Sequence, residues 1–90
     1  QAEQRRRLKP LQDKVRQVEK ALDSNRSRLT ELETRLADES IYNDPGRKDE
    51  VTGLLQDQAA VKSRVESLEG EWLEASERLE QATCEYGAIR

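Results

Sequence analysis

Apolar residues recur along the chain in alternating steps of three and four positions, and this repeat constrains the fold more than any other feature. The first stretch has nine such positions, eight of them apolar, and the second has twelve, eleven of them apolar. They are Leu8, Leu11, Val15, Val18, Leu22, Asn25, Leu29, Leu32 and Leu36, then Val51, Leu54, Gln58, Val61, Val65, Leu68, Trp72, Ala75, Leu79, Ala82, Tyr86 and Ile89. A mean repeat of about 3.5 residues keeps one stripe of a helix against a partner helix. We call these positions the seam, and they predict an all-α coiled coil.

The composition argues against an ordinary globular core. Of the 90 residues, 39% are charged and 33% are apolar, and there is no Phe. Such a chain is close to the limit at which too little apolar surface is buried to offset conformational entropy. A coiled coil concentrates these few apolar side chains on one stripe of each helix. The regular seam therefore favours a coiled coil over disorder.

The strong helix breakers of the interior lie in the segment 38–48, DESIYNDPGRK. Asp44 followed by Pro45 is typical of a helix start, because the carboxylate accepts backbone N–H groups and proline lacks the N–H that has no partner there. A connection this short places two helices as antiparallel neighbours. The sequence therefore predicts a two-helix antiparallel coiled-coil hairpin, with Ile41 and Tyr42 folding back over the open end of the seam.

The predicted boundaries describe one coiled-coil domain over residues 1–90. It has a basic lead-in over 1–9, a first helix over 10–39, a loop over 40–44, a second helix over 45–86 and a tail over 87–90. Pro10 sets the first boundary, since proline inside a helix removes a hydrogen bond. The lead-in is then either a separate frayed turn or a helix kinked at Pro10.

Seam residues whose numbers sum to 90 face one another if the hairpin turns at Pro45. This register also brings flanking residues of opposite charge together, which is typical of coiled coils. The pairs are Glu33 with Lys62, Arg26 with Glu69, Arg28 with Asp57, Lys14 with Glu71 and Arg35 with Glu50. Arg7 with Arg78 is a like-charged pair.

Positive charge is concentrated at the start of the chain. Residues 1–36 hold 10 basic and 6 acidic side chains, whereas residues 37–90 hold 6 basic and 13 acidic ones. The candidate nucleic-acid-binding residues are Arg5, Arg6, Arg7, Lys9, Lys14, Arg16 and Lys20. Contacts with phosphates need only charge, and the absence of interleaved aromatic residues argues against stacking on single strands. The alternative is a solvated, partly ion-paired helix start.

The tip of the predicted hairpin is a second candidate contact, formed by Tyr42, Arg47 and Lys48. A loop at the end of a rigid arm is well placed to meet a partner, although Tyr42 could instead pack as a lid on the seam. Trp72 occupies a seam position and is expected in the core. Cys84 falls on an outer position, and nothing in the sequence makes it reactive.

The sequence offers no catalytic, metal-binding or cofactor-binding pattern. It contains no His and one Cys, and its four glycines form no phosphate-binding loop. We therefore expect the chain to be no enzyme and to hold no cofactor or metal. It has no apolar run long enough to span a membrane and no secretory signal. A cytoplasmic protein without membrane contact is expected.

Three stretches resemble a known family: RRRLKPLQDKVRQVEKALD, DESIYNDPGRKDEV and SLEGEWLEASERLEQ. In this order and spacing they are similar to the C-terminal coiled-coil domain of bacterial ABC-F ATP-binding proteins, closest to the YheS type and more distantly the Uup type. The resemblance covers roughly residues 3–83 and leaves the end, CEYGAIR, unmatched. It implies a parent protein with two ATP-binding cassettes, where ATP and Mg bind, and action on the ribosome. In Uup-type members, the domain is regarded as DNA-binding.

Three functions follow as hypotheses. The leading one is a non-catalytic arm that contacts the ribosome or its RNA through the basic first helix and accompanies the cassettes of the parent protein. The second is DNA binding as in Uup-type members, although the acidic second helix is unlike a dedicated DNA binder. The third is a structural spacer or protein-docking hairpin, either a monomer or weakly self-associating through Ile41, Tyr42, Leu55 or Leu73.

Overall fold

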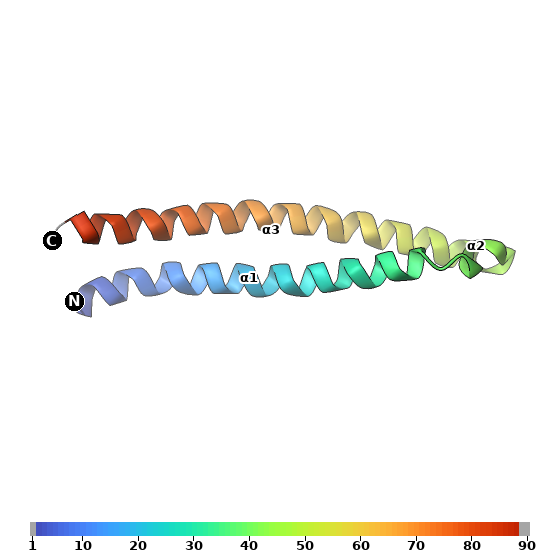
Figure 1. The fold of residues 1–90 in the computed structure, drawn as a ribbon, viewed down its shortest axis with the longest axis horizontal. Helices are drawn as coiled ribbons and strands as arrows, with labels where there is room; N and C mark the ends of the chain where they lie inside the picture. The colour runs from blue at the N-terminus through green and yellow to red at the C-terminus, as the bar shows by residue number, and fades with distance from the viewer. Residues whose placement is uncertain (1, 89–90) are drawn as a thin grey trace. The chain divides into compact units, whose positions relative to one another are not determined.

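The chain folds into helices and short connecting turns. The computed structural model describes residues 2–88, in which α1 (Ala2–Leu36), α2 (Ser40–Asn43), the 3-10 helix η1 (Pro45–Arg47) and α3 (Lys48–Ala88) follow one another (Figure 1). No strand occurs in this described range. The all-α prediction is confirmed.

Two compact units divide the chain. One unit combines Gln1–Leu22 with Ser67–Arg90, and the other is the continuous segment Asp23–Glu66. Each unit therefore contains a segment of α1 and a segment of α3. The seam residues of both segments provide its core, and each unit is described below by itself.

The helix bounds differ from those predicted. α2 lies in the predicted loop 40–44, and α3 runs over Lys48–Ala88 rather than 45–86. The first helix differs at both ends. α1 includes Pro10, so most of the lead-in belongs to this helix, and α1 ends at Leu36 rather than Glu39. Proline costs the helix one hydrogen bond, to the carbonyl of Arg6, on an exposed turn where water is available as a substitute. The surrounding Arg, Lys, Leu and Gln residues are good helix formers. They continue the helix through the proline.

Apart from Ile41, every buried residue in the described part of the chain is a seam residue. All nine seam positions of α1 are buried or half-buried, and so are nine of the ten seam positions of α3 up to Ala82. The most buried of them are Val18, Leu22, Leu32, Leu54, Val65, Leu68 and Ala75. The exception is Trp72, which is 36% exposed. The side chain of Tyr86 and all of Ile89 lie outside the described residues.

In the unit Asp23–Glu66, the core forms where α1 ends and α3 begins. Leu32, with no exposed surface, packs with Ile41 and Leu54, and Leu36, Val51 and Val61 pack against this cluster. Arg28, four residues before Leu32 on α1, forms an ion pair with Asp57 on α3, with 3.9 Å between Nη2 and Oδ2. This is one of the charged pairs that the sequence predicted.

Candidate nucleic-acid interface

The seven candidate nucleic-acid-binding residues all lie on α1, within the unit formed by Gln1–Leu22 and Ser67–Arg90. All seven are exposed: Arg5, Arg6, Arg7, Lys9, Lys14, Arg16 and Lys20. Only three acidic residues, Glu3, Asp13 and Glu19, accompany them in residues 1–22. This part of α1 therefore carries a net positive charge.

The helical period divides these residues between two sides of α1. At about 100° of rotation per residue, Arg5, Lys9, Arg16 and Lys20 fall within about 60° of arc, on the side away from the seam. We call these four residues the basic row. The first three of them line one open hollow on α1, together with Leu8, Gln12 and Asp13. Arg6 borders the row.

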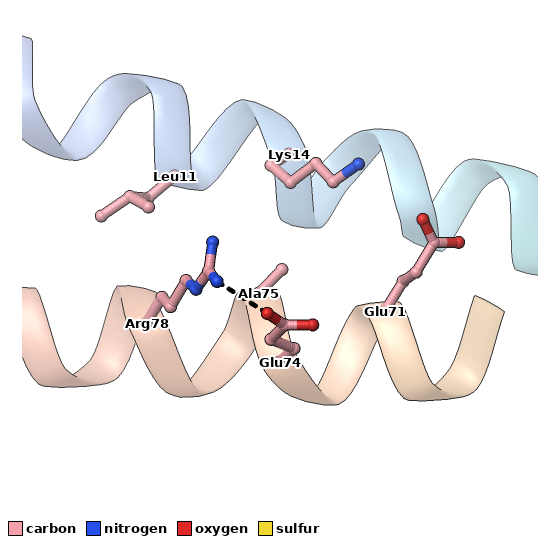
Figure 2. A pocket seen from close by; sticks show the side chains of 6 residues that line it. All are labelled: Leu11, Lys14, Glu71, Glu74, Ala75 and Arg78. Carbon is pink, nitrogen blue, oxygen red and sulfur yellow. Dashed lines mark hydrogen bonds and ion pairs between the residues drawn. The ribbon is translucent and has the colours of Figure 1, made fainter. Parts of the chain in front are cut away.

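Arg7 and Lys14 lie on the other side of α1, next to the seam, where carboxylates are within reach. Arg7 forms an ion pair with Glu3, 3.1 Å from Nη2 to Oε1, one helical turn away. Lys14 lines a hollow between α1 and α3 whose other lining residues are Leu11, Glu71, Glu74, Ala75 and Arg78 (Figure 2). In Figure 2, Glu71 extends from α3 toward the α1 segment that carries Lys14. Both cations thus lie among carboxylates of their own unit.

The sequence predicted Arg7 and Arg78 as a like-charged pair. In the structure, each of the two positive charges has a glutamate partner on its own helix. Arg78 donates to Glu74 on α3, with 2.7 Å between Nη2 and Oε1, just as Arg7 is paired with Glu3 on α1. Each arginine is therefore matched by a glutamate four residues before it. Such i,i+4 pairs stabilise a helix by about 0.2–0.5 kcal/mol each.

Trp72 joins α3 to α1 by a hydrogen bond that the sequence did not predict. Its indole Nε1 donates to Glu19 Oε1 at 3.0 Å, and the side chain is 36% exposed. The prediction that Trp72 belongs to the core is corrected to a position at the edge of the seam. The physical reason is that the indole N–H needs a partner, which an edge position provides. The bond also occupies one of the three carboxylates near the basic row.

At the predicted tip, Ile41 rather than Tyr42 closes the end of the core. Ile41 is 3% exposed and packs on Leu32 and Leu54, whereas Tyr42 is 55% exposed. The Tyr42 hydroxyl donates to the carbonyl of Leu36 at 2.6 Å, at the end of α1. A carbonyl in the last turn of a helix lacks a partner within the helix. Tyr42 therefore caps α1 from outside the core.

Asp44 and Pro45, where the sequence predicts the start of the second helix, begin the 3-10 turn η1. The backbone N–H of Gly46 donates to Asp44 Oδ1 at 2.9 Å, and Pro45 occupies the first position of η1. The turn is 3-10 helical before α3 begins at Lys48. A carboxylate that accepts from the first N–H groups is the expected cap of such a helix start.

Arg47, a candidate tip contact, is engaged within the chain. Its Nε and Nη2 donate to the two carboxylate oxygens of Glu50 at 2.8 and 3.1 Å, a bidentate arrangement. This hydrogen bonding raises the pKa of Arg47 and lowers that of Glu50. Lys48 is exposed, but residues 38–50 hold five acidic and two basic side chains. The tip is therefore an acidic surface, less suited to phosphates than the basic row.

Acid should loosen the tip. Hydrogen bonds from the Ser40 hydroxyl and N–H hold the pKa of Asp38 below its usual value, and Arg47 does the same for Glu50. Because the folded-state pKa of both groups is depressed, their stabilisation is complete above the unfolded-state values, about 4, and is lost as pH falls through the folded-state values. We therefore expect lower amide protection factors over residues 38–50 in acid.

The control for this acid effect is the double substitution Asp38→Asn and Glu50→Gln, followed by hydrogen exchange as a function of pH. The new Asn and Gln side chains do not titrate in this range, so the acid-induced loss of protection at the tip should shrink. An equally large loss of protection in the double variant would assign the effect to other carboxylates.

Comparison with known proteins relates the chain to ATP-binding proteins. Over 55 residues, which are 61% of this chain, it is 47% identical to proteins that are named as probable ATP-binding proteins. They are the "Probable ATP-binding protein YheS" of Escherichia coli K12 and its counterparts in strains O6:H1 and O157:H7. The matched stretch is 8% of the length of these relatives. No protein-family model and no solved structure matches the chain.

Within residues 2–88, no helix combines the length and the apolar character needed to cross a bilayer. In the same described part, no group of three or more His, Cys, Asp or Glu side chains is placed to hold a metal ion. Cys84 is a free, exposed thiol.

Proposed function

We propose that the chain is an antiparallel coiled-coil arm of an ABC-F ATP-binding protein. The burial of the seam positions supports the coiled coil. The core around Leu32 and Leu54 and the Arg28 to Asp57 ion pair support the antiparallel register in their unit. The identity with the YheS proteins of Escherichia coli supports the family. ATP binding and hydrolysis then belong to cassettes in the parent protein, and the arm itself is non-catalytic.

The arm contacts the ribosome or its RNA through α1. The observation that carries this proposal is the basic row, four exposed cations on the side of α1 away from the seam. Arg and Lys on one face of a helix attract the phosphate backbone without needing contacts to bases. A site of action on the ribosome places the arm in the cytoplasm.

Ribosome co-sedimentation of the parent protein tests this function. We expect the parent lacking residues 1–90 to bind ribosomes several-fold more weakly than the intact parent. The difference should shrink as salt rises, because salt weakens phosphate contacts. A parent with the double substitution Gln12→Ala and Ser24→Ala, which keeps every charge of the arm, is the control.

Two outcomes would decide against a ribosome-contacting arm. Unchanged sedimentation after the deletion would contradict it directly. The second outcome comes from competition. If duplex DNA displaces the protein from ribosomes at a lower concentration than ribosomal RNA does, the DNA-binding alternative is favoured. Both measurements use the same preparations.

A further inference from the structure

We propose that the basic row, Arg5, Lys9, Arg16 and Lys20, binds the phosphate backbone of a helical nucleic acid, and that Arg7 and Lys14 take no part. The inference rests on the proposed function and assigns the contact to particular side chains. It also specifies the form of the ligand, a duplex or hairpin stem rather than a single strand.

The first argument is the geometry of the row. With a rise of about 1.5 Å per residue, Arg5 and Lys20 are about 22 Å apart along the helix axis. Duplex DNA carries one negative charge for about every 1.7 Å of its axis. A straight row of this length therefore meets several phosphates of one rigid backbone at once.

The second argument is the availability of charge. Among the residues that the structure describes, no ion pair is found for Arg5, Lys9, Arg16 or Lys20. Arg7 is paired with Glu3. Lys14 forms no ion pair among the described residues either, but it shares its hollow with Glu71 and Glu74. A phosphate that approached Arg7 or Lys14 would have to compete with these carboxylates. The seven candidates thus separate into the four cations of the row, Arg6 at its border, Arg7 in an ion pair, and Lys14 beside two carboxylates.

The third argument concerns the form of the ligand. Proteins that bind single strands without sequence preference stack bases on aromatic side chains, and the row contains none. The α3 segment of the same unit also discourages a flexible strand from wrapping around it, since residues 67–88 hold six acidic side chains and one basic one. Contact is therefore confined to the row itself, which suits a stiff backbone.

Asp13 is an acidic residue that weakens this contact. It lines the same hollow as Arg5, Lys9 and Arg16, and it is exposed. A carboxylate beside a phosphate repels it. The variant Asp13→Asn should therefore bind more tightly than the wild type, whereas a purely structural role for this face predicts no change in binding.

The test is fluorescence anisotropy of the 90-residue chain against a labelled RNA stem, a DNA duplex of the same sequence and one of its single strands. Four phosphate contacts predict that the logarithm of the binding constant falls with the logarithm of salt concentration with a slope of about −3.6 on duplex DNA. Binding should then weaken by about 150-fold between 50 and 200 mM salt.

Single alanine substitutions identify the contacts. Each of Arg5→Ala, Lys9→Ala, Arg16→Ala and Lys20→Ala should flatten the slope by about 0.9. Arg7→Ala and Lys14→Ala are matched controls on the same helix, and their slopes should equal that of the wild type. Circular dichroism of every variant checks that the helices are retained.

The outcomes separate this inference from the proposed function. Steep, salt-dependent binding in which Arg7→Ala and Lys14→Ala flatten the slope as much as the row variants would overturn the row and leave nucleic-acid binding in place. Tighter binding of the single strand than of either duplex would overturn the helical ligand. No binding to any of the three probes at 50 mM salt would overturn both the row and the RNA contact.

Discussion

Replacing Leu32 with Asp is expected to unfold the chain. Among the side chains that the structure describes, Leu32 is the one that is large and completely buried, and it packs on Ile41 and Leu54. A carboxylate there would have no partner, and an uncompensated buried charge costs about 3–5 kcal/mol. Small proteins have a total stability of only about 5–15 kcal/mol. Far-UV circular dichroism should show most of the helical signal lost at 25 °C, and the cooperative thermal transition should disappear.

A milder substitution and a surface control make this prediction sharper. Leu32→Ala should lower the free energy of unfolding by about 2–5 kcal/mol, measured by urea denaturation. Leu55→Asp places the same charge on α3 at a leucine that is 50% exposed, where the effect should stay within about 0.5 kcal/mol. If Leu32→Asp melts like the wild type, the seam has been assigned to the wrong residues.

The seam could be predicted from the sequence because its period is a property of the helix itself. Residues spaced by three and four return to the same side of a helix, so apolar residues at that spacing must be buried together. The structure buries or half-buries Leu8, Asn25 and Gln58 together with the fully apolar positions. Even the polar members of the repeat therefore follow its geometry.

The ion pairs were predicted less well, because several partners of similar energy lie within reach of each charge. Arg28 does form the predicted pair with Asp57, but Arg35 binds Glu31 on its own helix at 3.2 Å instead of Glu50. Exposed pairs differ by only a few tenths of a kcal/mol. Burial cannot decide between them, so spacing alone does not identify the partner.

The candidate site, too, could be predicted only in part. The sequence itself gives the basic residues, and the rotation per residue gives the side of the helix on which they lie. The engagement of Arg7 by Glu3 and of Glu19 by Trp72 depends on side-chain positions. The spacing of four residues between Glu3 and Arg7 was a usable signal, whereas Glu19 and Trp72 are far apart in the chain.

Ile41 should prove to be the residue that holds the tip on the core. From the sequence, Ile41 and Tyr42 were predicted to have the same role, either as a lid on the seam or as exposed positions for self-association. In the structure, Ile41 is 3% exposed and packs on Leu32 and Leu54. Ile41→Ala is expected to lower the free energy of unfolding by about 2–5 kcal/mol, since it removes buried apolar contacts and leaves a cavity. Urea denaturation gives the total, and amide exchange over residues 36–54 shows where protection is lost.

Tyr42→Phe is the matched control, because it removes only the hydroxyl that donates to the Leu36 carbonyl. One such hydrogen bond contributes about 0.5–1.5 kcal/mol, less than the apolar contacts of Ile41. A larger loss for Tyr42→Phe than for Ile41→Ala would show that the tip is held by the cap of α1 rather than by the core.

Burial also removes Ile41 from the surface available for self-association. Tyr42, Leu55 and Leu73 remain as the exposed candidates. Ile41→Ala should then weaken folding without changing the association state that analytical ultracentrifugation measures, under conditions where the variant is folded.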